Sequence, residues 1–409
     1  MSENLQQQAV QIHMQSRVDM SHLSIQPDGD EYTVGDPNLR EFIRVPEEAV
    51  MVIRLMDGSK TVEEVQAKLL TEHGVEVDVL DFAEALLEMN LIRSVDDQIL
   101  IEHTQIEAKE WMRKLGQFFY GKVGVTLYSI CAAAVVAIYL VRTDLFPTFQ
   151  DAFVLSSIGL NTLLIFVVSW FLLLIHEIGH LLAAARLGIS ARLRLSLRLY
   201  WLVVETDMTG MWSQPKQQRY VPYLAGMLWD SVLLLGALFV QLMLSTESFW
   251  FGFSKMVALV LLFRLTWQFL VFIRTDMYFV MINSTNTSNL MMNTQTFLKS
   301  LVRIKLKEEE AREWDNLSAQ EKTVSKRYSL FYVLGCGIAL WLLVALQIPI
   351  VYQTLMIAGQ NMLQNPLTTI QFWDGSIVAI LFVLEVVLWL IGASNAYKTR
   401  RNNRVQATA

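Results

Sequence analysis

The stretch FLLLIHEIGHLLAAARLG, residues 171–188, places two histidines and a glutamate in a segment that is otherwise apolar enough for the interior of a membrane. His176, Glu177 and His180 are each costly to hold among lipid tails without a partner, and ionisable residues in such positions are functional by default. The stretch therefore predicts a membrane-spanning helix with a functional site inside it.

The composition of the whole chain supports this prediction. Of the 409 residues, 53% are hydrophobic and only 18% are charged, which is too apolar for an ordinary soluble domain of this length. Residues 1–120 carry much of the charge, whereas long apolar runs recur from Lys122 to Tyr397. We therefore expect a soluble N-terminal module followed by a membrane domain. The net charge of -6 points to no nucleic-acid partner.

The apolar runs predict membrane-spanning helices, because about 20 apolar residues cross the hydrocarbon as a helix and lipid offers the backbone no other partner. We expect a polytopic α-helical membrane protein with six spans, at about residues 122–142, 160–184, 222–245, 254–276, 329–351 and 373–396.

The positive charges predict the orientation of these spans. The loops after the second and fourth spans and the tail after Tyr397 are rich in Lys and Arg, and the other loops have almost none. Under the positive-inside rule, both termini and both basic loops are cytoplasmic. The first twenty residues lack a secretory signal. We expect a multi-pass protein of the bacterial cytoplasmic membrane, with the lipid bilayer as a partner.

Two histidines four residues apart lie on one face of a helix, so His176 and His180 can bind one metal ion with Glu177 beside it to accept a proton from water. This arrangement suits catalytic Zn2+, which takes three protein ligands and leaves a position open.

The third ligand must be a carboxylate, because the other four histidines all belong to the soluble part (His13, His22, His73 and His103). Asp276 is expected at the same depth as the two histidines and is the predicted ligand. Asp230 and Arg264 are expected at a common depth on adjacent spans, as a buried ion pair. Glu385 stays unassigned, with Arg264 or a polar cavity as its alternative partners.

Apolar and polar residues alternate between Ala191 and Leu199, in a pattern typical of a strand with one wet face. We expect a short β-hairpin at the cytoplasmic surface. Its exposed edge can pair with an extended peptide, or the hairpin can simply anchor to lipid headgroups. Under the first alternative the substrate-binding residues are Arg194, Leu195, Ser196, Leu197 and Arg198.

The sequence of the N-terminal module predicts short strands around Gly35-Asp36-Pro37 and then three helices. The first helix ends at Gly58, the second begins at a Thr61 cap and stops at Gly74, and the third begins at an Asp78 cap. This order indicates a small winged-helix-like α+β domain.

HEIGH, followed by an acid at the end of a later span, resembles the site-2 protease family of intramembrane zinc metallopeptidases. The resemblance implies that His176, His180 and Asp276 bind zinc and that Glu177 is the general base. The stretch ETDMTGMWSQPKQQRYVPYLAGMLWD further resembles the branch of peptide zinc metalloproteases. The chain departs from the family at Met277, where glycine is preferred, and in lacking Asn or Pro before Asp276.

The N-terminal run LMDGSKTVEEVQAKLL with DVLDFAEALLEMNLI is similar to PqqD-like domains, which recognise the leaders of ribosomally made, modified peptides. The resemblance implies capture of a leader as an added strand. The alternative is a docking or dimerisation module without peptide specificity.

Together these features predict a zinc endopeptidase that cleaves a small precursor peptide near the cytoplasmic face. A peptide-modifying enzyme or an exporter is a further expected partner. One alternative is a non-proteolytic membrane scaffold or export and immunity partner that binds a peptide. A second is regulated proteolysis of a membrane-spanning regulator.

The expected organisation divides the chain into seven parts. They are a disordered lead-in (1–28), the PqqD-like domain (29–103), an interfacial linker (104–121), the metalloprotease core (122–286), a cytoplasmic loop (287–327), two further spans (328–397) and a basic tail (398–409).

Overall fold

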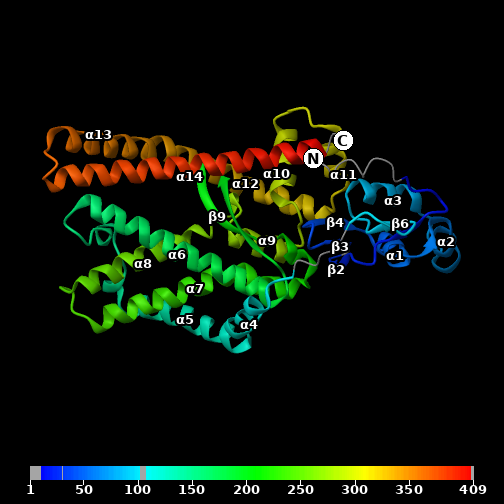
Figure 1. Ribbon diagram of the computed structural model, residues 1–409, viewed down its shortest axis with the longest axis horizontal. Helices are drawn as coiled ribbons and strands as arrows, with labels where there is room; N and C mark the ends of the chain where they lie inside the picture. The colour runs from blue at the N-terminus through cyan, green and yellow to red at the C-terminus, as the bar shows by residue number, and fades with distance from the viewer. Residues whose placement is uncertain (1–10, 30, 102–106, 407–409) are drawn as a thin grey trace. The chain divides into compact units, whose positions relative to one another are not determined.

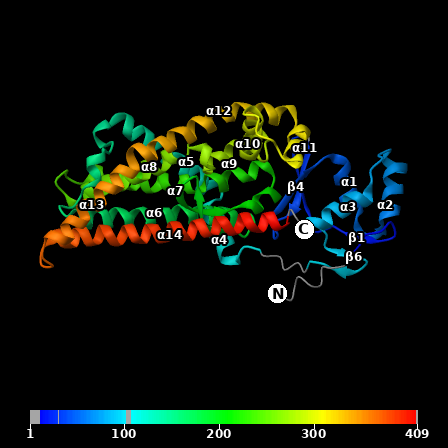
Figure 2. The same ribbon diagram turned by 90° about the horizontal axis from the view of Figure 1, so that it is seen from above.

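The computed structural model describes residues 11–29, 31–101 and 107–406, shown in Figures 1 and 2. The chain divides into two compact units. The N-terminal unit contains the described residues up to Lys114 together with Ala184–Ala191 and Met208–Arg219. The helical unit contains Leu115–Ala183, Arg192–Asp207 and the chain from Tyr220 onward.

Two antiparallel sheets and three helices form most of the N-terminal unit (Figure 1, blue to cyan). One sheet has the order β5-β1-β6-β7 and the other the order β2-β3-β4. The strands are β1 (Arg17–Asp19), β2 (Ser24–Asp28), β3 (Glu31–Asp36), β4 (Glu41–Val45), β5 (Asp57–Thr61), β6 (Ser94–Val95) and β7 (Gln98–Ile99).

The three helices are α1 (Glu47–Leu55), α2 (Val62–Lys68) and α3 (Val79–Glu88). The Thr61 side chain accepts from the Glu64 amide and the Glu64 carboxylate accepts from the Thr61 amide, so α2 begins with a capping box. The Asp78 side chain caps α3 through the Asp81 amide. The two caps expected from the sequence are confirmed, and Gly74 ends the helical turn Leu69–His73 in the left-handed region (φ 65°).

The prediction of a disordered lead-in over residues 1–28 is wrong for residues 11–28, and residues 1–10 lie outside the described part. Strands β1 and β2 lie in this stretch, and Val18 and Met20 are buried in the core with side chains from α1, α2 and α3. The reason is non-local: β1 pairs with β5 and β6, far along the chain, which the local polarity of the stretch does not indicate.

Two later segments complete the N-terminal unit. The buried carboxylate of Asp28 forms ion pairs with Arg44 at 3.1 Å and with Lys216 at 3.6 Å. The Ser24 hydroxyl donates to the Ser213 carbonyl at 3.2 Å, and an Arg40 Nη donates to the Ser190 carbonyl at 3.1 Å. The unit therefore reaches its final form only with residues that follow His180 in the sequence.

The rest of the chain is mainly helical. The helices are α4 (Glu110–Phe119), α5 (Lys122–Val141), α6 (Ile158–Arg186), α7 (Lys216–Met243), α8 (Phe249–Trp267), α9 (Asp276–Thr285), α10 (Leu290–Leu301), α11 (Glu308–Asn316), α12 (Ala319–Leu342), α13 (Ile348–Gln364) and α14 (Ile370–Gln406). Strands β8 (Arg192–Arg198) and β9 (Trp201–Asp207) form the expected hairpin.

Six helical segments of the described chain are long and apolar enough to cross a membrane: Lys122–Val141, Ile158–Arg186, Lys216–Met243, Phe249–Trp267, Ala319–Gln364 and Ile370–Lys398. Large apolar side chains remain exposed along them, including Leu140, Phe171 and Phe263. Such surfaces are stable when lipid covers them. These features indicate a multi-pass α-helical membrane protein.

A core of apolar side chains joins four of these helices. Val135 of α5, Leu172 of α6, Leu234 and Leu238 of α7 and Leu261 of α8 are buried in one cluster.

The fifth segment, Ala319–Gln364, is longer than the predicted span 329–351, because α12 continues through a wider turn at Leu343–Gln347 into α13. Helix α14 then returns beside α13 in both views (Figures 1 and 2).

The predicted fourth span, 254–276, is too long at its C-terminal end. Helix α8 ends at Trp267, a short 3-10 turn covers Val271–Ile273, and Asp276 begins the separate helix α9. Arg274 adopts the left-handed conformation (φ 60°), which a continuous helix cannot accommodate. The break turns the Asp276 side chain towards α6, and apolarity alone does not predict it.

Candidate metal centre

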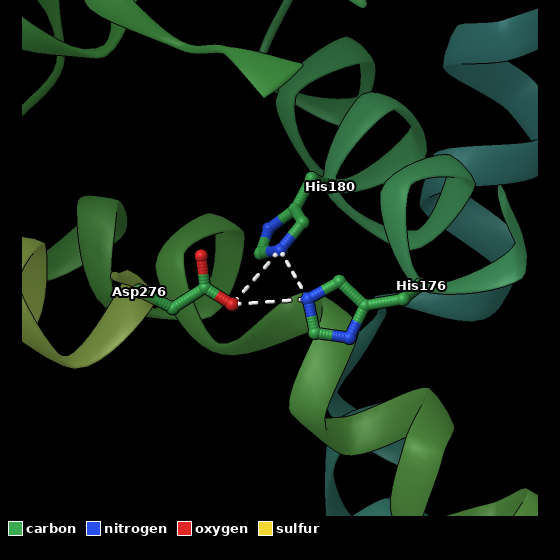
Figure 3. Close-up of side chains that lie close together, drawn as sticks. All are labelled: His176, His180 and Asp276. Carbon is green, nitrogen blue, oxygen red and sulfur yellow. Dashed lines mark hydrogen bonds and ion pairs between the residues drawn. The ribbon is translucent and has the colours of Figure 1, made fainter. Parts of the chain in front are cut away.

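Helix α6 holds His176 and His180 one turn apart, and α9 presents Asp276 from its first residue (Figure 3). His176 Nε2 and His180 Nε2 each lie 3.1 Å from Asp276 Oδ2, and the two nitrogens are 3.2 Å apart. A tetrahedral zinc with ligands at about 2.0–2.1 Å separates its ligand atoms by about 3.3 Å. The three atoms therefore have a spacing that one such ion fits.

The other nitrogens of the two imidazoles fix which atoms can bind a cation. His180 Nδ1 lies 2.7 Å from the Pro222 carbonyl oxygen, which can only accept, so this nitrogen carries the hydrogen. His176 Nδ1 lies 2.8 Å from Asp230 Oδ2, which as a carboxylate also accepts. Both Nε2 lone pairs then point at the Asp276 oxygen, and three electron-pair donors facing one another favour a cation between them.

Glu177 is buried beside these three residues but is not one of the converging donors. Its Oε2 accepts a hydrogen bond of 2.7 Å from the Thr206 hydroxyl on β9. The carboxylate is thus held in place by the hairpin, next to the two histidines in sequence and without an ion-pair partner in the described chain. This is an arrangement suited to a base that receives a proton.

Asp230 lies in α7 with 0% exposure, and Arg264 of α8 pairs with it. The Arg264 Nη1 to Asp230 Oδ1 distance is 3.4 Å, and Arg264 Nη2 donates to the Ser169 carbonyl at 3.1 Å. The ion pair is the one expected from the sequence. Its second role was not expected: the other oxygen of Asp230 orients His176 at the shorter distance of 2.8 Å.

Replacing Asp230 by Asn is expected to weaken zinc binding by about 10- to 100-fold, the range typical for loss of a carboxylate behind a metal-binding histidine. The side chain keeps its shape but no longer supplies the charge that fixes the hydrogen on His176 Nδ1. Chelator competition on purified protein measures the effect. The matched control is Asp374→Asn, which removes a carboxylate that accepts from Ser157 and Gly159 at the other end of α6. Equal zinc affinities for the two variants would contradict this role.

Two glycines, Gly179 of α6 and Gly226 of α7, lie where the helices pack closely around the histidine rings. A Cβ added at Gly179, inside HEIGH, would lie 2.9 Å from the Tyr120 hydroxyl and 3.1 Å from the Ala225 carbonyl. A Cβ added at Gly226 would lie only 2.3 Å from His176 Nε2. Glycine is therefore required where α7 passes the His176 ring.

The substitution Gly226→Ala is expected to displace the His176 ring and lower the zinc content of the purified protein to a small fraction of the wild-type value. Gly236→Ala, on the same helix, is the control, because a Cβ there meets nothing within 4 Å. Both changes replace glycine by a better helix former, so helix propensity does not separate them. Unchanged zinc content in Gly226→Ala would show that the ring can move without cost.

The β8–β9 hairpin packs against helix α14. Helix α14 contacts both strands: the Asn395 amide donates to the Leu195 carbonyl of β8 at 3.4 Å, and Gly392 lies against Leu202 of β9 and Leu197 of β8. Arg194 and Arg198 pair with Asp207 and Glu205 of β9. Neither β8 nor β9, which carries Thr206, has a second neighbouring strand in the described chain. Binding of substrate by residues 194–198 stays a prediction.

Sequence reasoning missed three groups at the centre: the Pro222 carbonyl, the Thr206 hydroxyl and the Gln268 amide. Gln268 follows the last residue of α8, and its Nε2 lies 3.4 Å from His176 Nε2. None of the three ionises, so no rule on charge in membranes marks them. Glu385, left unassigned above, is exposed on α14 and has no hydrogen bond or ion pair in the described chain.

Comparison with protein-family models, curated proteins and solved structures gives no match to this chain.

Proposed function

We propose that this protein is an intramembrane zinc endopeptidase of the site-2 protease type, and that it cleaves a small ribosomally made precursor peptide. The observation that carries the proposal is the convergence of two imidazole lone pairs and one carboxylate oxygen, at 3.1–3.2 Å from one another, beside a buried glutamate. A structural zinc site closes all four positions with protein ligands, whereas these residues supply three.

His176, His180 and Asp276 would hold the zinc, which would supply Lewis acidity to activate water near neutral pH and to polarise the peptide carbonyl. Glu177 accepts the proton that the attacking water loses as its oxygen bonds to the carbonyl carbon. When the C–N bond breaks, Glu177 returns this proton to the leaving nitrogen. Thr206 keeps the carboxylate in position throughout, through the 2.7 Å hydrogen bond.

The N-terminal unit is proposed to capture the leader of the peptide, as a winged-helix-like module of the PqqD type. In support, the outer strands of its sheets, β4 and β7 among them, have one edge without a neighbouring strand among the described residues, where a further strand can be added. Segments of this unit follow His180 by four residues and Thr206 by two residues in the chain. The unit that is proposed to hold the peptide therefore includes chain segments that come directly after His180 and Thr206 in the sequence.

The proposed location is the bacterial cytoplasmic membrane, with both termini and the two basic loops in the cytoplasm. The Lys and Arg residues after the second and fourth spans support this orientation.

The test is to co-express the protein with a short peptide encoded beside its gene and to analyse the peptide by mass spectrometry. We expect two fragments whose masses sum to the intact peptide plus one water. Zinc content is measured on the same preparation. An intact peptide bound to zinc-loaded protein would instead favour the non-proteolytic scaffold.

A further inference from the structure

Arg274 has an exposed guanidinium that forms no ion pair and no hydrogen bond within the part of the chain that the structure describes. It lies against the ring of Tyr278, with 5.8 Å between the guanidinium carbon and the ring centroid. Tyr278 is 2% exposed, and its hydroxyl accepts from the Met291 amide at 3.2 Å, so the ring is held in place. Contact with a ring face uses none of the five N–H donors of arginine. These donors are therefore available to an acceptor that the described chain does not supply.

The same guanidinium adds positive charge beside the β8–β9 hairpin. The ionisable side chains that contribute most to the electrostatic field at Arg274 are Arg198, Tyr278, Glu205 and Tyr328. Arg198 and Glu205 form an ion pair with each other, so the charge of Arg274 has no counter-charge of its own among them. Elsewhere on the hairpin two further arginines share one carboxylate. The described residues of this region therefore carry excess positive charge, which attracts an anionic group.

Arg274 lies next to the metal centre by two routes along the chain. It comes two residues before the proposed ligand Asp276, at the end of the 3-10 turn that precedes α9. It also lies near Glu205, the residue before Thr206, whose hydroxyl donates to Glu177 at 2.7 Å. Since an extended peptide spans about 3.3–3.6 Å per residue, a group a few residues from the cleaved bond can reach Arg274.

The backbone at Arg274 is consistent with a side chain kept for binding. Its φ of 60° lies in the left-handed region, where glycine and asparagine are favoured and arginine is strained. The break between α8 and α9 requires this conformation but not this side chain. Strained residues of this kind cluster at active sites and ligand-binding sites.

We propose that Arg274 binds a carboxylate of the peptide substrate. Two parallel N–H groups of a guanidinium match the two oxygens of a carboxylate, which gives geometric specificity as well as affinity. An Asp or Glu side chain near the cleaved bond and the C-terminus of the peptide both present this group. The inference rests on the proposed function and adds the substrate class: a peptide with a carboxylate within a few residues of the bond that is cleaved.

The experiment measures binding of labelled octapeptide mixtures to the full-length, zinc-loaded Glu177→Gln protein in detergent, so that binding is observed without cleavage. Each mixture has one position fixed as Asp or Asn and the others randomised, and each is made with a free and with an amidated C-terminus. At one or two positions Asp is expected to lower the Kd by about 10- to 100-fold relative to Asn, the usual contribution of a hydrogen bond to a charged group. A gain of this size from the free C-terminus instead identifies the chain end as the carboxylate.

Three further substitutions are made in the same Glu177→Gln protein. Arg274→Asn is expected to abolish the gain, because asparagine accepts the left-handed backbone but carries no charge. Arg274→Lys is expected to keep only part of it, because lysine keeps the charge without the two parallel donors. An undiminished gain in Arg274→Lys would contradict the inference even if Arg274→Asn failed to fold. Arg303→Asn is the matched control, because Arg303 is also exposed and left-handed (φ 57°) and follows α10, and it is expected to keep the full gain.

The outcomes separate the inference from the proposed function. A carboxylate preference that persists in Arg274→Asn, or that the parent protein lacks at every position and at the C-terminus, would overturn the inference. Loss of bound phosphatidylglycerol from Arg274→Asn, with no carboxylate preference in the parent, would assign the guanidinium to a lipid phosphate. Zinc-loaded wild-type protein that binds carboxylate peptides through Arg274 but cleaves none of them would overturn the proposed function alone.

Discussion

Replacing Glu177 by Gln is expected to slow peptide cleavage by on the order of 100- to 10,000-fold while leaving zinc content unchanged. The loss is that of a general base placed next to the reacting water. Glutamine keeps the shape of the side chain and an oxygen that can accept from the Thr206 hydroxyl, so the buried surroundings persist. The measurement is the rate of fragment appearance by mass spectrometry, at equal protein and peptide concentrations.

Glu385→Gln is the control for this change. It also neutralises a carboxylate within a membrane-spanning segment, but Glu385 is exposed on α14 and contacts none of the three proposed ligands. We expect wild-type rates from it. Cleavage by Glu177→Gln at a rate close to that of the wild type would assign the base to another group and remove the central role of HEIGH.

Replacing His180 by Ala is expected to reduce zinc affinity by more than about 100-fold, beyond the range for the Asp230 substitution, because a direct ligand is removed instead of its support. The change also removes the hydrogen-bond donor of the Pro222 carbonyl, and it leaves Asp276 with His176 as its one histidine neighbour at the centre. Metal analysis after gel filtration gives the stoichiometry, and chelator competition gives the affinity.

His73→Ala is the corresponding control, because His73 is an exposed histidine at the end of a helical turn in the N-terminal unit. Added zinc is expected to restore wild-type and His73→Ala protein after chelator treatment, but not His180→Ala. If His180→Ala retained one tightly bound zinc, the ion would have to be held elsewhere, and the convergence of the three donors would need another explanation.

The residues of α6 that form the centre could be predicted because their relation is local. A spacing of four places His176 and His180 on one helix face wherever that helix lies. Asp276 was selected from the few acids of the apolar runs because it was expected at the same depth as the two histidines. The structure brings all three together within 3.2 Å. That these three donors bind zinc is a proposal, which the measurements of metal content and chelator competition test.

The contacts that support the centre could not be predicted, because they join residues far apart in the chain. Asp230 was expected to pair with Arg264 on grounds of depth, and nothing in the sequence shows that its second oxygen faces His176, 54 residues away. Gln268 is uncharged, so its position in an apolar run attracts no notice. It becomes visible only through the break in the helix between Trp267 and Asp276.

The fold shows the same division between local and non-local information. The caps at Thr61 and Asp78 and the presence of six apolar segments are local patterns and were predicted correctly, whereas the ends of the fourth and fifth segments were not. Strand β1 was missed because it is short and pairs with β5 and β6, far along the chain, whereas β2 pairs with the next strand, β3. Short strands paired across a long sequence distance have no periodicity of their own.

The hydrogen bond between Ser24 and Ser213 has a consequence for how the protein folds during synthesis. These residues are 189 positions apart, so at about 5–20 residues per second the ribosome reaches Ser213 roughly 10–40 s after Ser24. Lys216, the second cation of Asp28, arrives at the same stage. During that interval α5 and α6 are synthesised and must enter the membrane. The N-terminal unit is thus begun first and finished late, and its completion requires that the helix with both histidines has already been made.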